Sequence, residues 1–558
     1  MRLISLPRGP QRWLLVFGLV IAGMALAATA NAANYYACDC ASGADAQCQV
    51  GNDSANGTSP ASAWRTYDRA QNAFGGLAAG DHLSFCRGGV FPIAGDTRWN
   101  NSNCTAAQNC FVGAYTPAWA SGDEARPRIT QTNGHAFEFI DGGEPDHEEG
   151  YRFSDLDLRC SACSGEAYGF VLYNDIDDVR LERLRISGFS IGVYLGGSNS
   201  CNGNPQCDAH NERLTLVESD ILDNPGQGFL GSGNDLLIAD NLFSGNGGAN
   251  NRDHNIYISE SGGQTNHIRI LRNELYRSSM GNGSTCLGTS LVVHGYTSDL
   301  LIEGNLVHED IGGAGQGCWG ISLTAGGTDE AEGFPRAIVR GNTIRNVGNT
   351  AIALSSCVDC IIENNIIEHE QPFEVTGISA PALGHDGNDL MMTHLTVRNN
   401  SIYTTANQDS LGIKVGGEGT QHVIVSNAIQ ATNTSGLFAC LSLNLPTSAY
   451  AAVNNNVCGY VAGGGREWEE GSGSLSAWRT ASGFDLASLA VAPGFASPGA
   501  PTHDLRAASI GAAMVDAGHL TLSAPREFFG NLRGASPDAG AHEFGSNDVI
   551  FANGFESN

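Results

Sequence analysis

The sequence predicts an all-β fold, a right-handed parallel β-helix, in which the chain winds as a solenoid between an N-terminal helical cap and a C-terminal cap region. Three observations predict it. A phrase of alternating apolar residues around one asparagine recurs from about residue 210 to 460. A second alternating strand follows the asparagine, about 15 to 20 residues later in most copies. Glycine is abundant, with 73 of 558 residues, which suits the tight corners of such a coil.

Residues 1–32 are expected to be a signal peptide. Three arginines precede an apolar run from Trp13 to Leu26, and the segment ends in small residues at Ala30-Asn31-Ala32. No later stretch reaches the roughly 18 apolar residues of a membrane span. We therefore expect a secreted or periplasmic chain without a membrane span. Cleavage removes three arginines and no acid, so the net charge moves from −29 to −32, which disfavours binding to nucleic acid or anionic membranes.

Residues 33–150 are expected to form the N-terminal cap and the first coils. The segment WRTYDRAQNAFGGL (64–77) has helical spacing, which places the side chains of Trp64, Tyr67, Ala70 and Phe74 on one face. The apolar alternation of DHLSFCRGG (81–89) predicts a strand directly after this helix.

Residues 151–462 are expected to form the β-helix core. Copies of the repeat include LLIADNLF, LLIEGNLV and CIIENNII, and their period-2 alternation is that of strands with one buried face. Successive asparagines lie 23 to 37 residues apart, which fits one turn of a three-sided coil with loop insertions. Two earlier copies are degenerate, with Ser219 and Leu184 in place of asparagine. Stacked turns would align the asparagines into a ladder of amide hydrogen bonds. The asparagines are Asn241, Asn273, Asn305, Asn342, Asn365, Asn400, Asn427 and Asn456.

The second strand of each turn predicts an outward-facing column of side chains. In NRDHNIYIS (251–259) the isoleucines take the inward positions, so Asn255, Tyr257 and Ser259 are expected to face solvent. His294 is expected on the same face one turn later. The full column is Tyr194, Tyr257, Val292, Ser322, Ala353, Ser379, Lys414 and Ser442.

The first strand of each turn predicts a ladder of alternating charges. Glu303, Arg340, Glu363 and Arg398 occupy equivalent positions on successive turns about 4.8 Å apart. We interpret them as structural ion pairs. The asparagine phrase stops near Val461, and residues 463–545 are expected to form a C-terminal extension and cap, followed by a tail over 546–558.

All 16 cysteines lie beyond the predicted cleavage site, which favours disulfides in an oxidising compartment. Several lie close in sequence, namely Cys104/Cys110, Cys160/Cys163, Cys201/Cys207 and Cys357/Cys360. Zinc is the alternative for the two Cys-x-x-Cys pairs, but these are almost 200 residues apart, whereas zinc ribbons hold such pairs about 15–20 residues apart.

Several segments resemble those of exported bacterial β-helix proteins. GNDSANGTSPASAWRTYDRAQNAFGGLAAGDHLSFCRGGVF (51–91) resembles the opening of many such chains, PREFFGNLRGASPDAGAHEF (525–544) is similar to their closing segment, and DVIFANGFESN to their short tails. The repeats resemble those shared by polysaccharide lyases, mannuronan C5-epimerases and glycoside hydrolases of this fold. DHNIYIS resembles the histidine-bearing rung of some lyase- and epimerase-like members, in which histidine or tyrosine removes the C5 proton of a uronic acid. The epimerase motif has a proline between the acid and the histidine, but here Asp253 directly precedes His254, which argues against epimerisation.

The resemblance implies a polysaccharide lyase that cleaves a uronate-containing polymer by β-elimination. Arg252 or Asn255 would neutralise the carboxylate, His254 or His294 would act as the base, and Tyr257 as the acid. The alternative interpretation is that Tyr257 is an exposed aromatic rung and His254 a satisfied corner residue, neither with a catalytic role. The alternative functions are a non-catalytic β-helical surface protein that binds glycan, and a glycoside hydrolase, for which no spacing singles out a carboxylate pair.

No cofactor is required by these motifs, although two acidic runs could hold Ca²⁺. The runs are DGGEPDHEEG (141–150) and NDIDDVR (174–180), and a solvated acidic turn is the ordinary interpretation of such runs. Lys414 is expected about five turns from Tyr257, too far to share one sugar. The expected partner is a polysaccharide, and the expected oligomeric state is a monomer.

Overall fold

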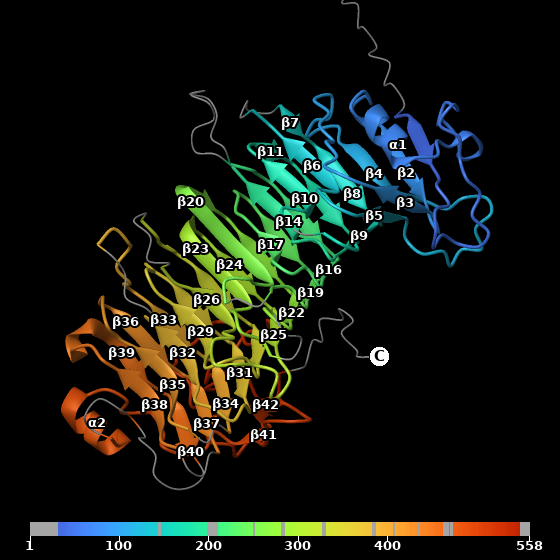
Figure 1. Cartoon of the computed structure of the whole chain (residues 1–558). Coiled ribbons are helices and arrows are strands. Elements are labelled where there is room, and N and C mark those ends of the chain that lie inside the picture. Colours follow the sequence, from blue (N-terminus) through green and yellow to red (C-terminus); the bar gives the residue numbers. More distant parts are fainter. Residues whose placement is uncertain are drawn as a thin grey trace, which may run out of the picture.

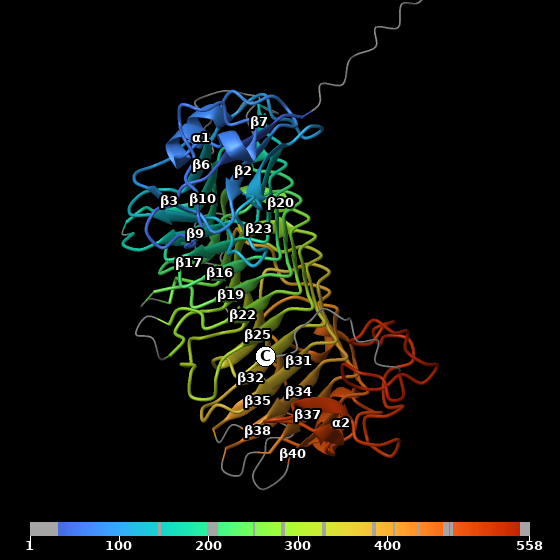
Figure 2. The ribbon, with the colours of Figure 1, turned by 90° about the vertical axis from the view of Figure 1, so that its right-hand side faces the viewer.

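The computed structural model of the chain describes residues 32–142, 147–163, 165–197, 210–248, 251–280, 285–325, 331–381, 387–405, 408–432, 436–460, 468 and 473–546. The predicted signal peptide and the C-terminal tail therefore lie outside the described residues, apart from Ala32 and Ser546. Three long parallel sheets run along the molecule and form the sides of an elongated solenoid (Figures 1 and 2). The predicted all-β parallel β-helix is confirmed.

Sheet A holds the strands that precede the asparagine corner. They are β1 (Asn34–Ala37), β2 (His82–Cys86), β4 (Cys110–Tyr115), β8 (Tyr151–Ser154), β12 (Arg180–Glu182), β15 (Thr215–Val217), β18 (Leu237–Ala239), β21 (Arg269–Leu271), β24 (Leu301–Glu303), β27 (Ile338–Arg340), β30 (Ile361–Glu363), β33 (Thr396–Arg398), β36 (His422–Val425) and β39 (Tyr450–Asn454).

Sheet B holds the strands that follow that corner. They are β3 (Val90–Ile93), β5 (Arg128–Gln131), β9 (Asp157–Cys160), β13 (Arg185–Ser187), β16 (Asp220–Leu222), β19 (Leu242–Ser244), β22 (Glu274–Tyr276), β25 (Leu306–His308), β28 (Thr343–Arg345), β31 (Ile366–His369), β34 (Ser401–Thr404), β37 (Ala428–Ala431) and β40 (Val457–Tyr460).

Sheet C completes each turn. Its strands are β6 (Phe137–Ile140), β10 (Tyr168–Tyr173), β14 (Ile191–Gly196), β17 (Gln227–Leu230), β20 (Ile256–Asn266), β23 (Leu291–Ser298), β26 (Ile321–Leu323), β29 (Thr350–Leu354), β32 (Thr376–Ala380), β35 (Ser410–Val415) and β38 (Phe438–Leu443). Two small sheets pair β7 (Glu148–Glu149) with β11 (Ile176–Asp177) and β41 (Phe495–Ser497) with β42 (Asp504–Ala507). The helices are α1 (Tyr67–Phe74) and α2 (Leu475–Ser482), with 3-10 turns at Pro60–Ser62 and Thr447–Ala449. Among the described helices, none is long and apolar enough to cross a membrane.

The core lies inside the coil, where the middle residue of each short strand stacks on its counterparts. In sheet A the stacked side chains are fully or almost fully buried, because the period-2 alternation turns them all inward. This column consists of Ile238, Ile270, Ile302, Val339, Ile362, Val397 and Ile424.

The predicted asparagine ladder is confirmed at the corner between sheets A and B. Each side-chain amide from Asn241 onward donates to the carbonyl oxygen of the next asparagine at 2.9–3.0 Å, up to Asn456. The degenerate position Ser219 heads the ladder, where its backbone N–H donates to Asn241 Oδ1 at 3.0 Å. The ladder ends on the buried carboxylate of Asp485, which Asn456 Nδ2 reaches at 3.3 Å and Trp478 Nε1 of α2 at 2.8 Å. The helix α2 therefore terminates the ladder.

The predicted charge ladder is also confirmed on the outer face of sheet A. Glu303, Arg340, Glu363 and Arg398 pair in register, with N–O distances of 2.8 Å between Arg340 and Glu303 and 2.7 Å between Arg398 and Glu363.

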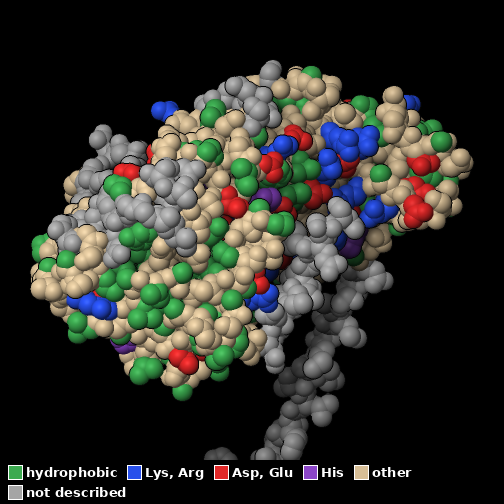
Figure 3. All heavy atoms as spheres, turned by 90° about the horizontal axis from the view of Figure 1, so that it is seen from below, with side chains coloured by type: hydrophobic (Ala, Val, Ile, Leu, Met, Phe, Trp, Pro, Cys, Tyr) green, Lys and Arg blue, Asp and Glu red, His purple; other side chains and the backbone are tan. Residues whose placement is uncertain are grey.

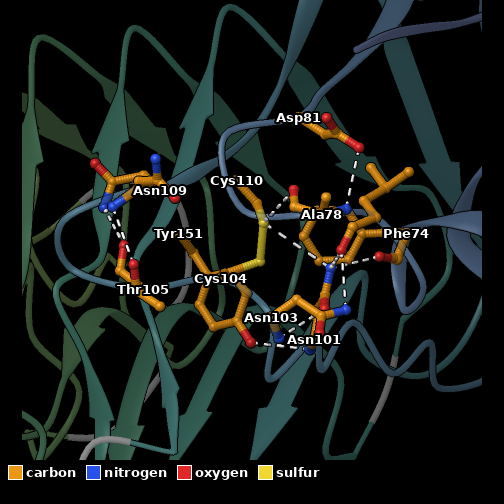
Figure 4. Close-up of a disulfide and its surroundings, with 12 residues drawn as sticks. Phe74, Ala78, Asp81, Asn101, Asn103, Cys104, Thr105, Asn109, Cys110 and Tyr151 are labelled. Carbon is orange, nitrogen blue, oxygen red and sulfur yellow. Dashed lines mark hydrogen bonds between the residues drawn. A yellow bond between two sulfur atoms is a disulfide. The ribbon is translucent and has the colours of Figure 1, made fainter. Parts of the chain in front are cut away.

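The N-terminal helix covers the first coils, as its sequence predicts. It begins at Tyr67, with Thr66 Oγ1 as the N-cap acceptor, and buries Tyr67, Ala70 and Phe74. Figure 4 shows how the chain past this helix is fixed: the Cys104–Cys110 disulfide lies beside Asn101, whose amide donates to the carbonyl of Phe74 at 2.7 Å. These bonds satisfy carbonyl groups at the C-terminal end of α1 and tie the loop over residues 101–110 to the helix.

Seven disulfides lie within the described residues, and no cysteine among these residues is free. Both Cys-x-x-Cys pairs are disulfides, so the prediction of disulfides over zinc is confirmed. The predicted Cys201/Cys207 pair lies outside the described residues. The bonds are Cys38–Cys86, Cys40–Cys48, Cys104–Cys110, Cys160–Cys163, Cys286–Cys318, Cys357–Cys360 and Cys440–Cys458.

The C-terminal segment folds back across the outside of the later coils. Asn364 donates to the carbonyl of Arg526 at 2.8 Å, and Asn399 donates to the carbonyl of Asp538 at 3.0 Å. Arg533 is buried in this segment and donates to Asn364 Oδ1 at 2.9 Å. Because these contacts join residues 139 to 169 positions apart, the segment is part of the solenoid and not a separate appendage.

Candidate active site on the outer face of sheet C

The stretch 251–259 enters sheet C at β20, which pairs in parallel with β17 and β23. Ile256 and Ile258 are fully buried, as predicted, and Tyr257 points outward and is partly exposed. Tyr257 is in register with Val292, and Ser259 with His294. The predicted proximity of His294 to this rung is therefore confirmed.

The outward column differs from the prediction in two respects. The strand β17 places Leu230 between Tyr194 and Tyr257, which are thus two rungs apart. Beyond Tyr257 most members of the column are buried, although they point outward. The buried members are short or β-branched side chains that do not project past their neighbours, namely Val292, Ser322, Ala353, Ser379 and Ser442.

Three aromatic rings form a continuous cluster on this face, which we call the ring cluster: His254, Tyr257 and His294. The centroid of the Tyr257 ring lies 5.1 Å from that of His254 and 5.7 Å from that of His294. Both contacts are nearly perpendicular, at 83° and 77°, the edge-to-face arrangement that aromatic rings favour. Within the described residues, Tyr257 Oη makes no hydrogen bond. The phenol is thus held by its ring and keeps its hydroxyl for a ligand.

His254 lies at the corner before β20 and is buried, with 5% of its surface exposed. Its Nδ1 lies 2.7 Å from the carbonyl oxygen of Thr289. A carbonyl only accepts, so Nδ1 carries the proton and Nε2 carries the lone pair of a neutral imidazole. Burial, with a smaller contribution from nearby His294, lowers the pKa of His254 to about 4 against the opposing effect of the Thr289 carbonyl. His254 is therefore a neutral side chain at any pH well above 4.

His294 is the more accessible of the two histidines, with a quarter of its side chain exposed. Its Nδ1 lies 3.7 Å from Oε1 of Glu332, a carboxylate that is almost fully buried and also accepts from the backbone N–H of Gly295 at 3.1 Å. This arrangement places a carboxylate next to the Nδ1 side of the imidazole. Glu332 was not predicted, because it enters from a loop 38 residues after His294 that has no repeat pattern.

Gln227 holds the loop that precedes the rung. Its side-chain amide donates to the carbonyl of Arg252 at 2.9 Å, and its side-chain carbonyl accepts from the backbone N–H of His254 at 2.5 Å. Arg252 lies two residues before His254 in the sequence, and its side chain is exposed. One glutamine thus fixes the backbone at both residues.

The prediction that Asn255 faces solvent is wrong. Asn255 is fully buried, and its Oδ1 accepts from Asn246 at 3.0 Å. Asn246 in turn accepts from Asn224 at 2.9 Å, which makes a second, shorter amide ladder at another corner. The strand begins at Ile256, so Asn255 belongs to the corner, where its amide also donates to Ser290 Oγ at 3.2 Å. These bonds use the amide fully, and Asn255 leaves the candidate set.

A hollow of about 270 Å³ opens on the same sheet, nearer the C-terminal end. Trp319, Glu374 and Asp409 line it, and Ser379 of the outward column lies at its base. Trp319 is partly exposed, and its Nε1 donates to Asn349 Oδ1 at 2.8 Å. Register places Ser379 four rungs from Tyr257, or about 19 Å at the usual strand spacing. Lys414 lies one rung further, as predicted, and does not join the ring cluster.

The described carboxylates of the two acidic runs are held by protein groups. Residues 143–146 of the first run lie outside the described residues. Glu148 accepts from the Asn101 backbone at 3.0 Å, and Glu149 accepts from the Ala106 backbone at 2.9 Å. Asp177 and Asp178 share Arg213, at 2.8 and 3.0 Å. Among the described residues, the only groups of three or more potential metal ligands within 4.8 Å of one another contain disulfide cysteines.

The match to a family model agrees with the geometry of the three sheets. Residues 319–476 match the family model described as a right-handed β-helix region. No curated protein matches the chain. The chain is similar to solved structures of pectate lyase Pel9A (12% identity, 92% of this chain and 96% of that chain, TM-score 0.41) and a rhamnogalacturonan lyase (12% identity, 85% and 95%, TM-score 0.37). It is also similar to the GH136 lacto-N-biosidase from Eubacterium ramulus (12% identity, 78% and 68%, TM-score 0.39). The register of the three sheets and the family match over residues 319–476 show that this chain has the right-handed parallel β-helix fold.

Proposed function

We propose that the protein is an exported polysaccharide lyase that cleaves a uronate-containing polymer by β-elimination at the ring cluster. The observation that carries the proposal is the contact of one phenol with two imidazoles on neighbouring rungs of sheet C. The rungs are about 4.8 Å apart, so the two kinds of proton-transfer group lie within reach of a single sugar ring. Seven disulfides support export to an oxidising compartment.

In this proposal His294 is the base. It removes the C5 proton of the uronate, and Glu332 behind the ring stabilises the imidazolium that forms. Arg252 pairs with the substrate carboxylate, which makes the C5 proton more acidic. The electron pair left at C5 forms the C4–C5 double bond as the C4–O bond breaks. Tyr257 donates its phenolic proton to the departing oxygen.

His254 has a positioning role. Burial holds its pKa near 4, so this imidazole is a poor proton acceptor compared with an ordinary histidine. Its edge contact fixes the Tyr257 ring, and its Nε2 offers a lone pair to the phenol or to a sugar hydroxyl. Replacement of His254 should therefore disturb the orientation of Tyr257 and not remove the proton acceptor.

A second candidate function, glycan binding without cleavage, is favoured by the hollow beside Trp319. A partly exposed indole with carboxylates around it is suited to the apolar face and the hydroxyls of a sugar. The hollow and the ring cluster lie on one sheet, about 19 Å apart, so one extended polymer could contact both.

The test is incubation of the purified protein with polygalacturonate, alginate and neutral glycans, with ultraviolet detection of the unsaturated product. We expect product from a uronate polymer, and a loss of at least a hundredfold in kcat for His294→Ala and Tyr257→Phe, the scale of general acid–base catalysis. Lys414→Ala, five rungs away on the same column, is the matched control. Unchanged turnover in both site variants contradicts the assignment. New reducing ends without unsaturation indicate a hydrolase, and binding without either product indicates a binding protein.

A further inference from the structure

The outer face of sheet B carries a group of arginines near the N-terminal end of the solenoid. We call it the arginine patch: Arg126, Arg128, Arg159 and Arg185. Arg128, Asp157, Arg185 and Asp220 follow one another in register on β5, β9, β13 and β16. Arg159 lies on the same outer face of β9, and Arg126 precedes β5.

The patch is positive in a strongly acidic protein. Arg128 and Arg159 share the buried carboxylate of Asp157, at 3.4 and 2.8 Å. Arg126 approaches Asp220 only to 3.9 Å. The four arginines of the patch and the aspartates Asp157 and Asp220 sum to a charge of +2, whereas the whole chain carries −29. Figure 3 shows Lys and Arg side chains gathered over the N-terminal half of this view, to the right.

Arg185 is the centre of the patch and the least satisfied of its arginines. It lies in register between two aspartates, yet it makes no ion pair or hydrogen bond with any described residue. Its Nε is buried without an acceptor. The Arg185 side chain as a whole is partly exposed, so its guanidinium group, which pairs with no described carboxylate, remains available to an anionic ligand.

We propose that the arginine patch is a second polysaccharide-binding site, which takes the carboxylates of a polyuronate. A guanidinium presents paired N–H groups that match the two oxygens of a carboxylate. Arg128 and Arg185 stand two rungs apart, about 10 Å, so the patch can engage more than one charged group of the same polymer. The choice of polyuronate rests on the proposed function, whereas the anion site itself rests on Arg185 and its neighbours.

The site lies on a different sheet from the ring cluster. A polymer held there would remain bound to the enzyme between cleavage events, and the catalytic groups would not take part in that contact. The patch would also counteract the repulsion that a polyanion meets from the rest of this acidic surface.

Binding of polygalacturonate to the full chain, measured by isothermal titration calorimetry, tests this proposal. All proteins carry Tyr257→Phe so that the polymer stays intact. We expect Arg185→Gln to weaken binding about tenfold, the usual size of a charge-assisted hydrogen bond, and Arg159→Gln/Arg185→Gln to weaken it further. Arg269→Gln is the matched control, because it removes the same charge from a different sheet. Arg269 is exposed on sheet A and makes no ion pair with a described residue. Arg185→Lys keeps the charge but not the paired N–H groups, and we expect intermediate affinity.

Equal weakening by Arg185→Gln and Arg269→Gln overturns the proposal, because it shows only a net-charge effect. Equal affinity for the methyl-esterified polymer overturns it as well, since that polymer lacks the carboxylates. Binding of dextran sulfate but not of polygalacturonate identifies a sulfate site and rejects the carboxylate. Cleavage of short oligosaccharides by Arg185→Gln in the otherwise native chain reports on the proposed function separately, and we expect it to be unchanged.

Discussion

Removal of one central asparagine from the ladder should destabilise the solenoid by about 4 kcal/mol. Asn342 is fully buried, and its side chain takes part in four hydrogen bonds. Its Oδ1 accepts from the backbone and from the side chain of Asn305, both at 2.9 Å, and its Nδ2 donates to Ile302 O at 2.9 Å and Asn365 Oδ1 at 3.0 Å. At about 1 kcal/mol for each bond, Asn342→Ala loses about 4 kcal/mol. The orphaned backbone N–H of Asn305 adds to this loss.

The measurement is urea unfolding with the disulfides intact, together with amide hydrogen exchange. Neighbouring coils of a solenoid stabilise each other locally, so exchange should accelerate most in β24, β27 and β30. Asn72→Ala is the control, because Asn72 is exposed on α1 and bonds only within that helix, and we expect a change within 0.5 kcal/mol. If Asn342→Ala is no more destabilising than Asn72→Ala, the ladder does not stabilise the fold and the reasoning is refuted.

Three further predictions follow from burial, charge and loop length. Burial lowers the pKa of His369 to about 4, so the unfolded state binds more protons than the folded state between pH 6.5 and 4. The free energy of unfolding should therefore fall by about 3 kcal/mol as the pH drops through this window. In urea titrations, His369→Gln should lose that part of the pH dependence. Arg185→Gln should leave the melting temperature unchanged or raise it, because it removes a buried N–H without an acceptor, and a fall of several degrees would show that Arg185 stabilises the fold. The Cys38–Cys86 bond spans 48 residues and the Cys160–Cys163 bond spans 3. Replacement of both cysteines by serine should lower the free energy of unfolding by about 4 kcal/mol at the first bond and by less than about 2 kcal/mol at the second. Equal losses in calorimetry would contradict the loop-entropy argument.

Periodic features of the fold could be predicted from the sequence. The asparagine ladder follows from a repeated residue at a repeated corner, and the approach of His294 to Tyr257 follows from counting one turn along the outward column. The ion pairs of Arg340 with Glu303 and of Arg398 with Glu363 follow in the same way. In each case the inference needs only that equivalent positions stack.

Features supplied by corners and loops could not be predicted in this way. Asn255 was assigned to the strand, but it lies one residue before the strand and joins a second ladder. In the strand β17 (QGFL) the inward Phe229 is followed directly by the outward Leu230. Because both side chains are apolar, the sequence does not show the alternation that marks a strand. Glu332 approaches His294 from a loop with no repeat pattern, so its position depends on tertiary packing alone. Gln227 begins the strand β17 and bonds to the backbone of His254, a contact that the apolar alternation of the strand does not indicate.

The folded-back C-terminal segment has a consequence for the order in which the protein assembles. Coils can stack as soon as they are synthesised, because each one needs only its predecessor. Contacts such as Arg533 with Asn364 and Ala524 with Asn399 must wait until the end of the chain exists, 125 to 169 residues later. In a nascent or truncated chain, several coils are therefore folded while the outer corner that the C-terminal segment covers is still exposed to solvent. A protease that cleaves at this corner would distinguish incomplete chains from the full-length protein.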